Sequence, residues 1–233
     1  MGFLWRECSW PAKQVKRFNL QCKYPWDGQI KITLDPDQSE VFSLNVRIPG
    51  WAQGRPVPGD LYKYLDSTVA PVGLKVNGKA EALKLKHGFA SIERRWKQGD
   101  VVELSLPMPV RRVVAHEAVK DDAGLVAIER GPIVYCLEGS DNKDVFRLVL
   151  PDEAKLVAEP RGDLLGGVTV IQGEGRLAVQ DAAGKILTQP AQMLAIPYYA
   201  WCNRGPTPMN VWLARTADKV QPLPATANLK SEK

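Results

Sequence analysis

The sequence predicts an all-β protein built from two antiparallel β-sandwich modules of jelly-roll type. Short segments alternate apolar and polar residues with period two, and no segment has the apolar spacing of an amphipathic helix of three or more turns. The chain also holds 19 glycines and 18 prolines, which supply frequent breaks between strands. Many short strands separated by such breaks are typical of sandwich folds.

Strands in the first half alternate so that each has one apolar face and one face in water. Residues 35–37, Asp-Pro-Asp, form the turn after the first strand. Asn77 and Gly78 tolerate positive φ angles and predict a hairpin turn of type I′. Sheets with one solvent-exposed face are typically antiparallel. We expect the strands at residues 89–94 and 101–106 to pair across residues 97–100. The expected strands are residues 30–34, 42–48, 89–94 and 101–106.

The second half repeats this pattern with short strands and frequent turns. Residues 166–167 and 173–175 are rich in glycine but lack the strand-then-helix context of a phosphate loop, so they are expected to be turns. Cys136 and Cys202 are expected to be buried thiols within strands. The expected strands are residues 125–130, 133–137, 145–150, 155–159, 168–173, 176–179, 192–196 and 209–214.

The composition is that of an ordinary globular protein. Hydrophobic residues make up 45% and charged residues 24% of the chain, which argues against disorder and against a membrane protein. The net charge of +5 is spread among interleaved acidic residues, so no nucleic-acid partner is expected. No apolar run approaches the roughly 18 residues of a membrane span, and the N-terminus lacks the features of a secretory signal. We expect a cytoplasmic location and no membrane partner.

The boundary between the two modules is expected where two prolines flank Met108, after the strand that ends at Leu106. Residues 1–107 are assigned to the first sandwich and residues 108–198 to the second. Residues 216–233 are polar and rich in Pro and Ala, so they are expected to form a surface tail.

Four segments are distinctive as a set. They are residues 24–28 (Tyr-Pro-Trp-Asp-Gly), residues 47–51 (Arg-Ile-Pro-Gly-Trp), residues 124–138, with an Arg-Gly-Pro turn between two apolar runs, and residues 199–206 (Tyr-Ala-Trp-Cys-Asn-Arg-Gly-Pro). Together they resemble the C-terminal part of bacterial hydrolases of the β-L-arabinofuranosidase type, the DUF1680 or glycoside hydrolase family 127 proteins. The resemblance extends over residues 24–215.

The resemblance implies a helical catalytic barrel followed by two sandwich domains, with residues 199–215 returning to the first sandwich. It also implies hydrolysis by a zinc-bound cysteine nucleophile, with adjacent cysteines and a Glu-x-Cys element. This sequence has neither element, and Glu7-Cys8 has the wrong spacing. No catalytic residue or metal ligand is therefore assigned, and zinc is expected only in the catalytic barrel, not in this chain.

The residues needed for other kinds of catalysis are not clearly present in this sequence either. His87 and His116 show no metal-binding spacing, and His116 is expected at a strand end, making backbone hydrogen bonds. Paired carboxylates of the kind that glycosidases use stay open as an alternative to a solvated loop. The acidic residues that cluster in sequence are Glu117, Asp121, Asp122 and Glu129.

Carbohydrate binding is the better functional alternative, because aromatic rings can stack on sugar rings while neighbouring polar groups fix hydroxyls. The candidates lie beside Gly or Pro, at strand ends or in loops, where binding residues concentrate. At any one of these sites, however, closing the end of a sandwich core is the more common role of a large aromatic residue beside Pro or Gly. The candidate residues are Trp26, Asp27, Trp51, Trp201, Asn203 and Arg204.

The sequence therefore favours a non-catalytic β-sandwich portion of a glycoside hydrolase, which packs on and supports a catalytic barrel. The alternative is an independent carbohydrate-binding module. A self-contained hydrolase would need an active site that these residues do not supply. A sandwich face without its barrel would expose apolar area, so a homo-oligomer, most simply a two-fold dimer, is expected.

Overall fold

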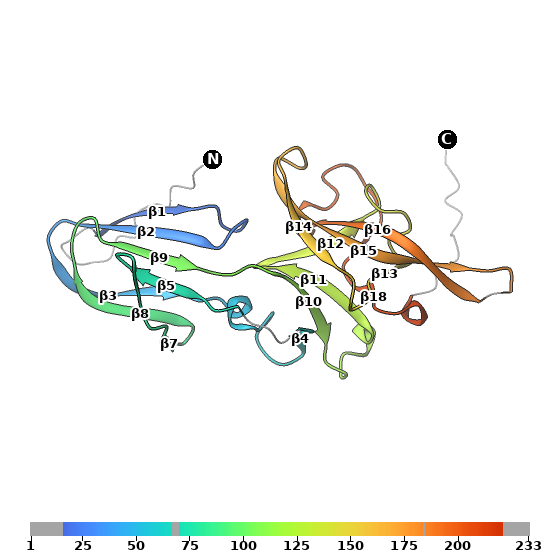
Figure 1. Cartoon of the computed structure of the whole chain (residues 1–233), viewed down its shortest axis with the longest axis horizontal. Helices are drawn as coiled ribbons and strands as arrows, with labels where there is room; N and C mark the ends of the chain where they lie inside the picture. The colour runs from blue at the N-terminus through green and yellow to red at the C-terminus, as the bar shows by residue number, and fades with distance from the viewer. Residues whose placement is uncertain (1–15, 67–69, 184, 221–233) are drawn as a thin grey trace. The chain divides into compact units, whose positions relative to one another are not determined.

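The computed structural model describes residues 16–66, 70–183 and 185–220 (Figure 1). Within these ranges the only helices are four 3-10 turns of three or four residues, so the all-β prediction is confirmed. No helix in the same ranges is long and apolar enough to cross a membrane.

The chain folds into two compact units. The first comprises residues 1–54 and 68–108, and the second comprises residues 55–67 and 109–233. The continuous assignment of residues 1–107 to one module is therefore wrong for residues 55–67. This segment contains β4 (Tyr62–Tyr64), which pairs with β10 (Val110–Ala115) in the second unit.

The first unit is a sandwich of two antiparallel sheets (Figure 1). The five-stranded sheet has the order β1 (Lys16–Cys22), β2 (Gln29–Pro36), β9 (Val101–Ser105), β5 (Gly73–Val76) and β6 (Lys79–Ala80). The three-stranded sheet has the order β3 (Glu40–Arg47), β8 (Phe89–Trp96) and β7 (Leu85–Lys86). Apolar residues of both sheets form one core, in which Leu34, Trp96 and Val102 are fully buried.

Strands β8 and β9 lie in opposite sheets, so their expected pairing across residues 97–100 is wrong. The Asp100 carboxylate holds the intervening turn, because it accepts hydrogen bonds of 2.9 Å from the Lys97 backbone and from the Asn77 amide. Alternation gives each strand one apolar face, but it does not say on which side of the core the strand lies. Strands β2 and β3 are separated between the two sheets in the same way.

The predicted hairpin turn at Asn77-Gly78 is confirmed. Both residues have positive φ angles, 51° and 76°, as a type I′ turn requires. The turn joins β5 to β6.

The second unit is built on a ten-stranded sheet with the path β17-β12-β16-β15-β13-β18-β11-β10-β4, and with β14 beside β15. All its recorded strand pairs are antiparallel except β13 with β18. The strands not yet given are β11 (Leu125–Arg130), β12 (Ile133–Glu138), β13 (Leu148–Val149), β14 (Leu156–Arg161), β15 (Val168–Gln180), β16 (Ile186–Pro197), β17 (Met209–Asn210) and β18 (Leu213–Ala214).

Residues 173–175 lie inside the long strand β15, so the turn expected there is wrong. Glycine is needed because neighbouring groups approach the backbone closely. A Cβ on Gly175 would lie 2.6 Å from Met193 Sδ and 2.7 Å from the Val149 carbonyl oxygen. The glycines thus let β15 pass close to other chain segments without ending the strand.

The return of residues 199–215 to the first sandwich is also wrong. Strand β17 pairs with β12, and β18 pairs with β11 and β13, all within the second unit. Burial explains this placement, since Leu213 and Ala214 are buried in the core of the second unit. The chain then forms the 3-10 turn η4 (Ala217–Lys219), and Val220 packs against the same core. Residues 221–233 of the expected surface tail lie outside the described residues.

Candidate functional site

The first group of predicted sugar-binding residues lies in the first unit, in the turn before β2. Backbone hydrogen bonds from Trp26 and Asp27 to the Lys23 carbonyl, of 2.8 and 3.3 Å, close this turn. The Asp27 carboxylate accepts a hydrogen bond of 2.9 Å from the Gln29 backbone. One oxygen of the Asp27 carboxylate therefore stabilises the turn itself.

Gly28 is required at the end of this turn, because a Cβ there would lie 1.8 Å from the Leu106 carbonyl oxygen. The backbone of Gly28 also accepts a hydrogen bond of 2.9 Å from the Leu106 N–H. The turn is thus fixed to the end of the five-stranded sheet.

Trp51 lies beside this turn, in the 3-10 turn η1 (Gly50–Gln53). Its half-buried ring packs against the core of the first unit. Partial burial raises the pKa of the Tyr24 hydroxyl, and a hydrogen bond with Trp51 opposes this shift. The structure therefore brings residues 24–27 and Trp51 together.

The second group lies in the second unit, in the loop that follows η3 (Tyr198–Ala200). Arg204 forms ion pairs with Glu138 and Asp141, and Glu138 is fully buried. The Glu138 carboxylate also accepts a hydrogen bond of 3.0 Å from the Cys202 backbone. Hydrogen bonding to Asp141 and Glu138 raises the pKa of the Arg204 guanidinium despite its partial burial. Arg204 thus ties the loop to the sheet.

The neighbouring polar groups also make contacts inside this loop. The Asn203 amide donates a hydrogen bond of 3.1 Å to the Ala200 carbonyl, and the Trp201 indole donates one of 3.4 Å to the Thr207 carbonyl. The aromatic rings remain accessible, since Tyr199 and Trp201 are 63% and 39% exposed. The polar side chains of Asn203 and Arg204 are thus engaged within the protein, and the exposed groups named here are aromatic rings.

The six predicted residues accordingly form two groups. Trp26, Asp27 and Trp51 lie in the first unit, and Trp201, Asn203 and Arg204 lie in the second. Sugar binding by either group stays a prediction.

The cysteines differ in their surroundings. Cys136 is buried in β12, as predicted, and burial raises its pKa to about 12. Cys202 is exposed in the loop with a φ of 67°, so its expected burial in a strand is wrong. Within the described ranges no group of three or more His, Cys, Asp or Glu residues is arranged to hold a metal ion. Glu7 and Cys8 lie outside these ranges.

His116 directly follows β10, and its predicted position at a strand end is confirmed. Its backbone N–H donates to the Leu61 carbonyl at 2.7 Å, and its Nδ1 accepts a hydrogen bond of 3.1 Å from the Ala118 backbone.

A buried polar network in the second unit was not predicted. The Tyr64 hydroxyl donates a hydrogen bond of 2.6 Å to the Glu129 carboxylate. The Arg111 guanidinium lies 3.9 Å from the centre of the Tyr64 ring and bonds to Asp66 at 3.2 Å. Burial raises the pKa of Glu129, although Tyr64 and Arg111 oppose the shift. Glu129 thus belongs to a structural network and not to the solvated loop expected for the acidic cluster.

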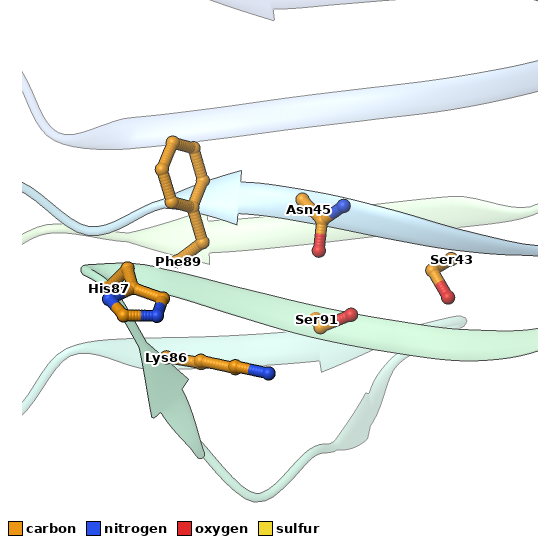
Figure 2. Close-up of a pocket in the computed structure, with 6 residues that line it drawn as sticks. All are labelled: Ser43, Asn45, Lys86, His87, Phe89 and Ser91. Carbon is orange, nitrogen blue, oxygen red and sulfur yellow. The ribbon is translucent and has the colours of Figure 1, made fainter.

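A groove in the first unit was also missed, because its residues look like an ordinary solvent face. It has a volume of about 530 Å³ and is lined by residues of β3, β7 and β8, with the exposed ring of Phe89 at one end (Figure 2). The lining residues are Ser43, Asn45, Lys86, His87, Phe89 and Ser91.

Two family models match this chain one after the other. The β-L-arabinofuranosidase GH127 middle domain matches residues 3–108, and the glycoside hydrolase family 127 C-terminal domain matches residues 110–214. The chain belongs to glycoside hydrolase family 127. Its two matched regions adjoin between residues 108 and 110, where the division between the compact units also falls.

This GH127 chain is similar to the non-reducing end β-L-arabinofuranosidase of Bifidobacterium longum subsp. longum. The two are 33% identical over 211 residues, which cover 82% of the chain and 29% of that protein. A solved GH127 β-arabinofuranosidase matches with a TM-score of 0.84 and 35% identity, over 89% of the chain and 33% of that structure.

A solved GH127 β-L-arabinofuranosidase from Geobacillus stearothermophilus T6 matches with a TM-score of 0.75 and 38% identity, over 86% of the chain and 31% of that structure. The GH127 chain therefore spans about a third of the length of the relatives that it matches.

Proposed function

We propose that this chain is a non-catalytic β-sandwich portion of a β-L-arabinofuranosidase, which packs on and supports a catalytic helical barrel. The supporting observation is its match to the middle and C-terminal GH127 domains, at about a third of the length of its relatives. The remaining two thirds of such a protein would hold the barrel, its zinc ion and the hydrolytic chemistry. The chain itself would carry no zinc and would act in the cytoplasm.

The loop after η3 is suited to contact a neighbouring domain. Its ion pairs and hydrogen bonds are made within the second unit. The rings of Tyr198 and Tyr199 in η3 and of Trp201 in the loop are exposed. Large aromatic rings on a fixed loop bury much apolar area at a small cost in side-chain entropy, as protein contacts favour.

Activity of the isolated chain tests this proposal. We expect no hydrolysis of a chromogenic β-L-arabinofuranoside with zinc and a thiol reductant present. Turnover above the blank that a single substitution within this chain abolishes would contradict the supporting role.

Self-association is part of the same proposal. Without a barrel, an exposed aromatic face would be covered most simply by a second copy of the chain. Light scattering over a dilution series should show a dimer at high micromolar concentration, and Trp201→Ala should shift it toward monomer. A strictly monomeric particle would contradict this part of the proposal.

An independent carbohydrate-binding module is the second candidate function. It is favoured by the exposed Trp201 ring and by the half-buried Trp26 and Trp51 beside one turn. Calorimetric titration with an arabino-oligosaccharide would show saturable binding that Trp51→Ala or Trp201→Ala weakens. Such binding by a chain without a barrel partner would favour the module over the supporting role.

A further inference from the structure

The groove between β3, β7 and β8 lies on the outer face of the three-stranded sheet (Figure 2). Alternation along β3 and β8 places their exposed residues on this face and their apolar residues in the core. The register sets Asn45 opposite Ser91, and Phe89 opposite Lys86. An aromatic ring, an amide, hydroxyls and an ammonium group therefore line one concave surface.

The Phe89 ring is held in place at one end of this groove. The Arg47 guanidinium lies 5.2 Å from the ring centre and donates a hydrogen bond of 3.3 Å to the His87 carbonyl. Gly88 makes this arrangement possible, because a Cβ there would lie 1.7 Å from Arg47 Nη1. A ring that is already oriented loses little entropy when a ligand stacks on it, and Phe89 keeps 41% of its surface exposed.

The polar groups of the groove are available to a ligand. Among the described residues, the Asn45 amide and the Ser91 hydroxyl have no hydrogen-bond partner, and Lys86 has no acidic partner. The Ser43 hydroxyl donates a hydrogen bond of 3.4 Å to the Glu93 carboxylate at the far end of the groove, away from Lys86 (Figure 2). The groove thus combines a stacking surface, free groups for hydroxyls and one unpaired positive charge.

We propose that this groove binds an acidic saccharide. One sugar ring would stack on Phe89, its hydroxyls would meet Asn45 and Ser91, and its carboxylate would meet the Lys86 ammonium. A nucleic acid fits less well, because phosphate contacts along a strand require several cations, and Lys86 is the only lysine or arginine among the described residues that line the groove. This inference does not rest on the proposed supporting role, and it concerns residues distinct from the predicted aromatic sites.

Calorimetric titration with two matched trisaccharides tests the proposal. Trigalacturonate carries carboxylates where α-1,4-galactotriose carries hydroxymethyl groups. We expect the 233-residue chain to bind trigalacturonate saturably and more tightly than galactotriose, with an affinity that falls as salt rises. Lys86→Gln should weaken trigalacturonate binding about fivefold without changing galactotriose binding. Phe89→Ala should weaken binding of both about tenfold.

Two matched controls keep the test specific. Phe18→Ala removes an exposed phenylalanine from β1, and Lys79→Gln removes an exposed lysine from β6, so neither should change the affinity. Thermal melts would confirm that all four variants are folded. Absence of trigalacturonate binding by the folded wild-type chain would overturn the proposal. Equal affinity for both trisaccharides, insensitivity to Phe89→Ala, or tighter binding of a short single-stranded oligonucleotide would also overturn it.

Discussion

The Tyr64 hydroxyl donates a hydrogen bond of 2.6 Å to the buried carboxylate of Glu129, 65 residues further along the chain. Glu129 pairs with Arg111 in the strand register, and the Arg111 guanidinium covers the Tyr64 ring. This contact attaches residues 55–67 to the second unit, although the residues on both sides of that segment belong to the first.

Removing the Tyr64 hydroxyl should destabilise the protein. Tyr64→Phe leaves the Glu129 carboxylate buried without its donor, which costs about 1–3 kcal/mol of unfolding free energy. Urea denaturation would measure this loss. Tyr62→Phe is the matched control, because its hydroxyl bonds at 3.1 Å to Asp122, which lies in the 3-10 turn η2 (Lys120–Asp122) and is not fully buried. Its effect should be clearly smaller. Equal effects of the two substitutions would contradict the importance of burial.

The same network should make stability depend on pH. Burial raises the pKa of Glu129, so the folded protein binds this proton more tightly than the unfolded chain does. Its contribution to stability is therefore present below the unfolded pKa of about 4.3 and is lost as pH rises through the folded value. Glu129→Gln cannot titrate. The unfolding free energy of this variant relative to wild type should therefore increase with pH across the window, whereas a flat difference would refute the raised pKa.

The ion pair between Arg204 and Glu138 should be important for the loop after η3. Arg204→Ala leaves the fully buried Glu138 carboxylate without its cation, and breaking such a pair costs about 3 kcal/mol. Arg204→Lys should lose less, because it keeps the charge but not the two-pronged geometry. Arg161→Ala breaks an exposed pair with Asp163 and should leave the unfolding midpoint unchanged. A similar loss in both alanine variants would argue against a special role for Arg204.

Close packing at Gly175 gives a further prediction. Gly175→Ala places a methyl group against Met193 and the Val149 carbonyl, and such overpacking costs about 1–3 kcal/mol. Gly162→Ala is the control, since nothing lies within 4 Å of its added Cβ. Thermal unfolding of both variants would decide the matter, and a Gly175→Ala protein as stable as wild type would refute the constraint.

Local patterns predicted the strands well where one sequence signal suffices. Alternation and the Arg-Gly-Pro turn gave the bounds of β11 as observed, and Asn77-Gly78 gave its turn type. The predicted pairing of β8 with β9 was wrong because an apolar face is compatible with either side of a sandwich core. The placement of β18 was missed because it depends on which core Leu213 enters, a contact between distant parts of the chain.

The candidate site was harder to predict for a similar reason. Tryptophan beside Gly or Pro identified exposed or half-buried rings, but the sequence did not show that Arg204 faces Glu138 and Asp141. The Phe89 groove combines residues from three strands, each of which has the ordinary composition of a solvent face. Only the register reveals that Asn45, Ser91 and Phe89 share it.

The placement of residues 55–67 means that the polypeptide leaves the first unit, enters the second, returns and leaves again. Dissection of the protein at residue 108 would therefore yield two defective fragments. The shorter fragment would carry a strand without its partner β10, and the longer one would expose the sheet edge and the carboxylate that this strand covers. Recombinant halves should be poorly soluble when made separately and should recover when mixed, as complementing fragments do.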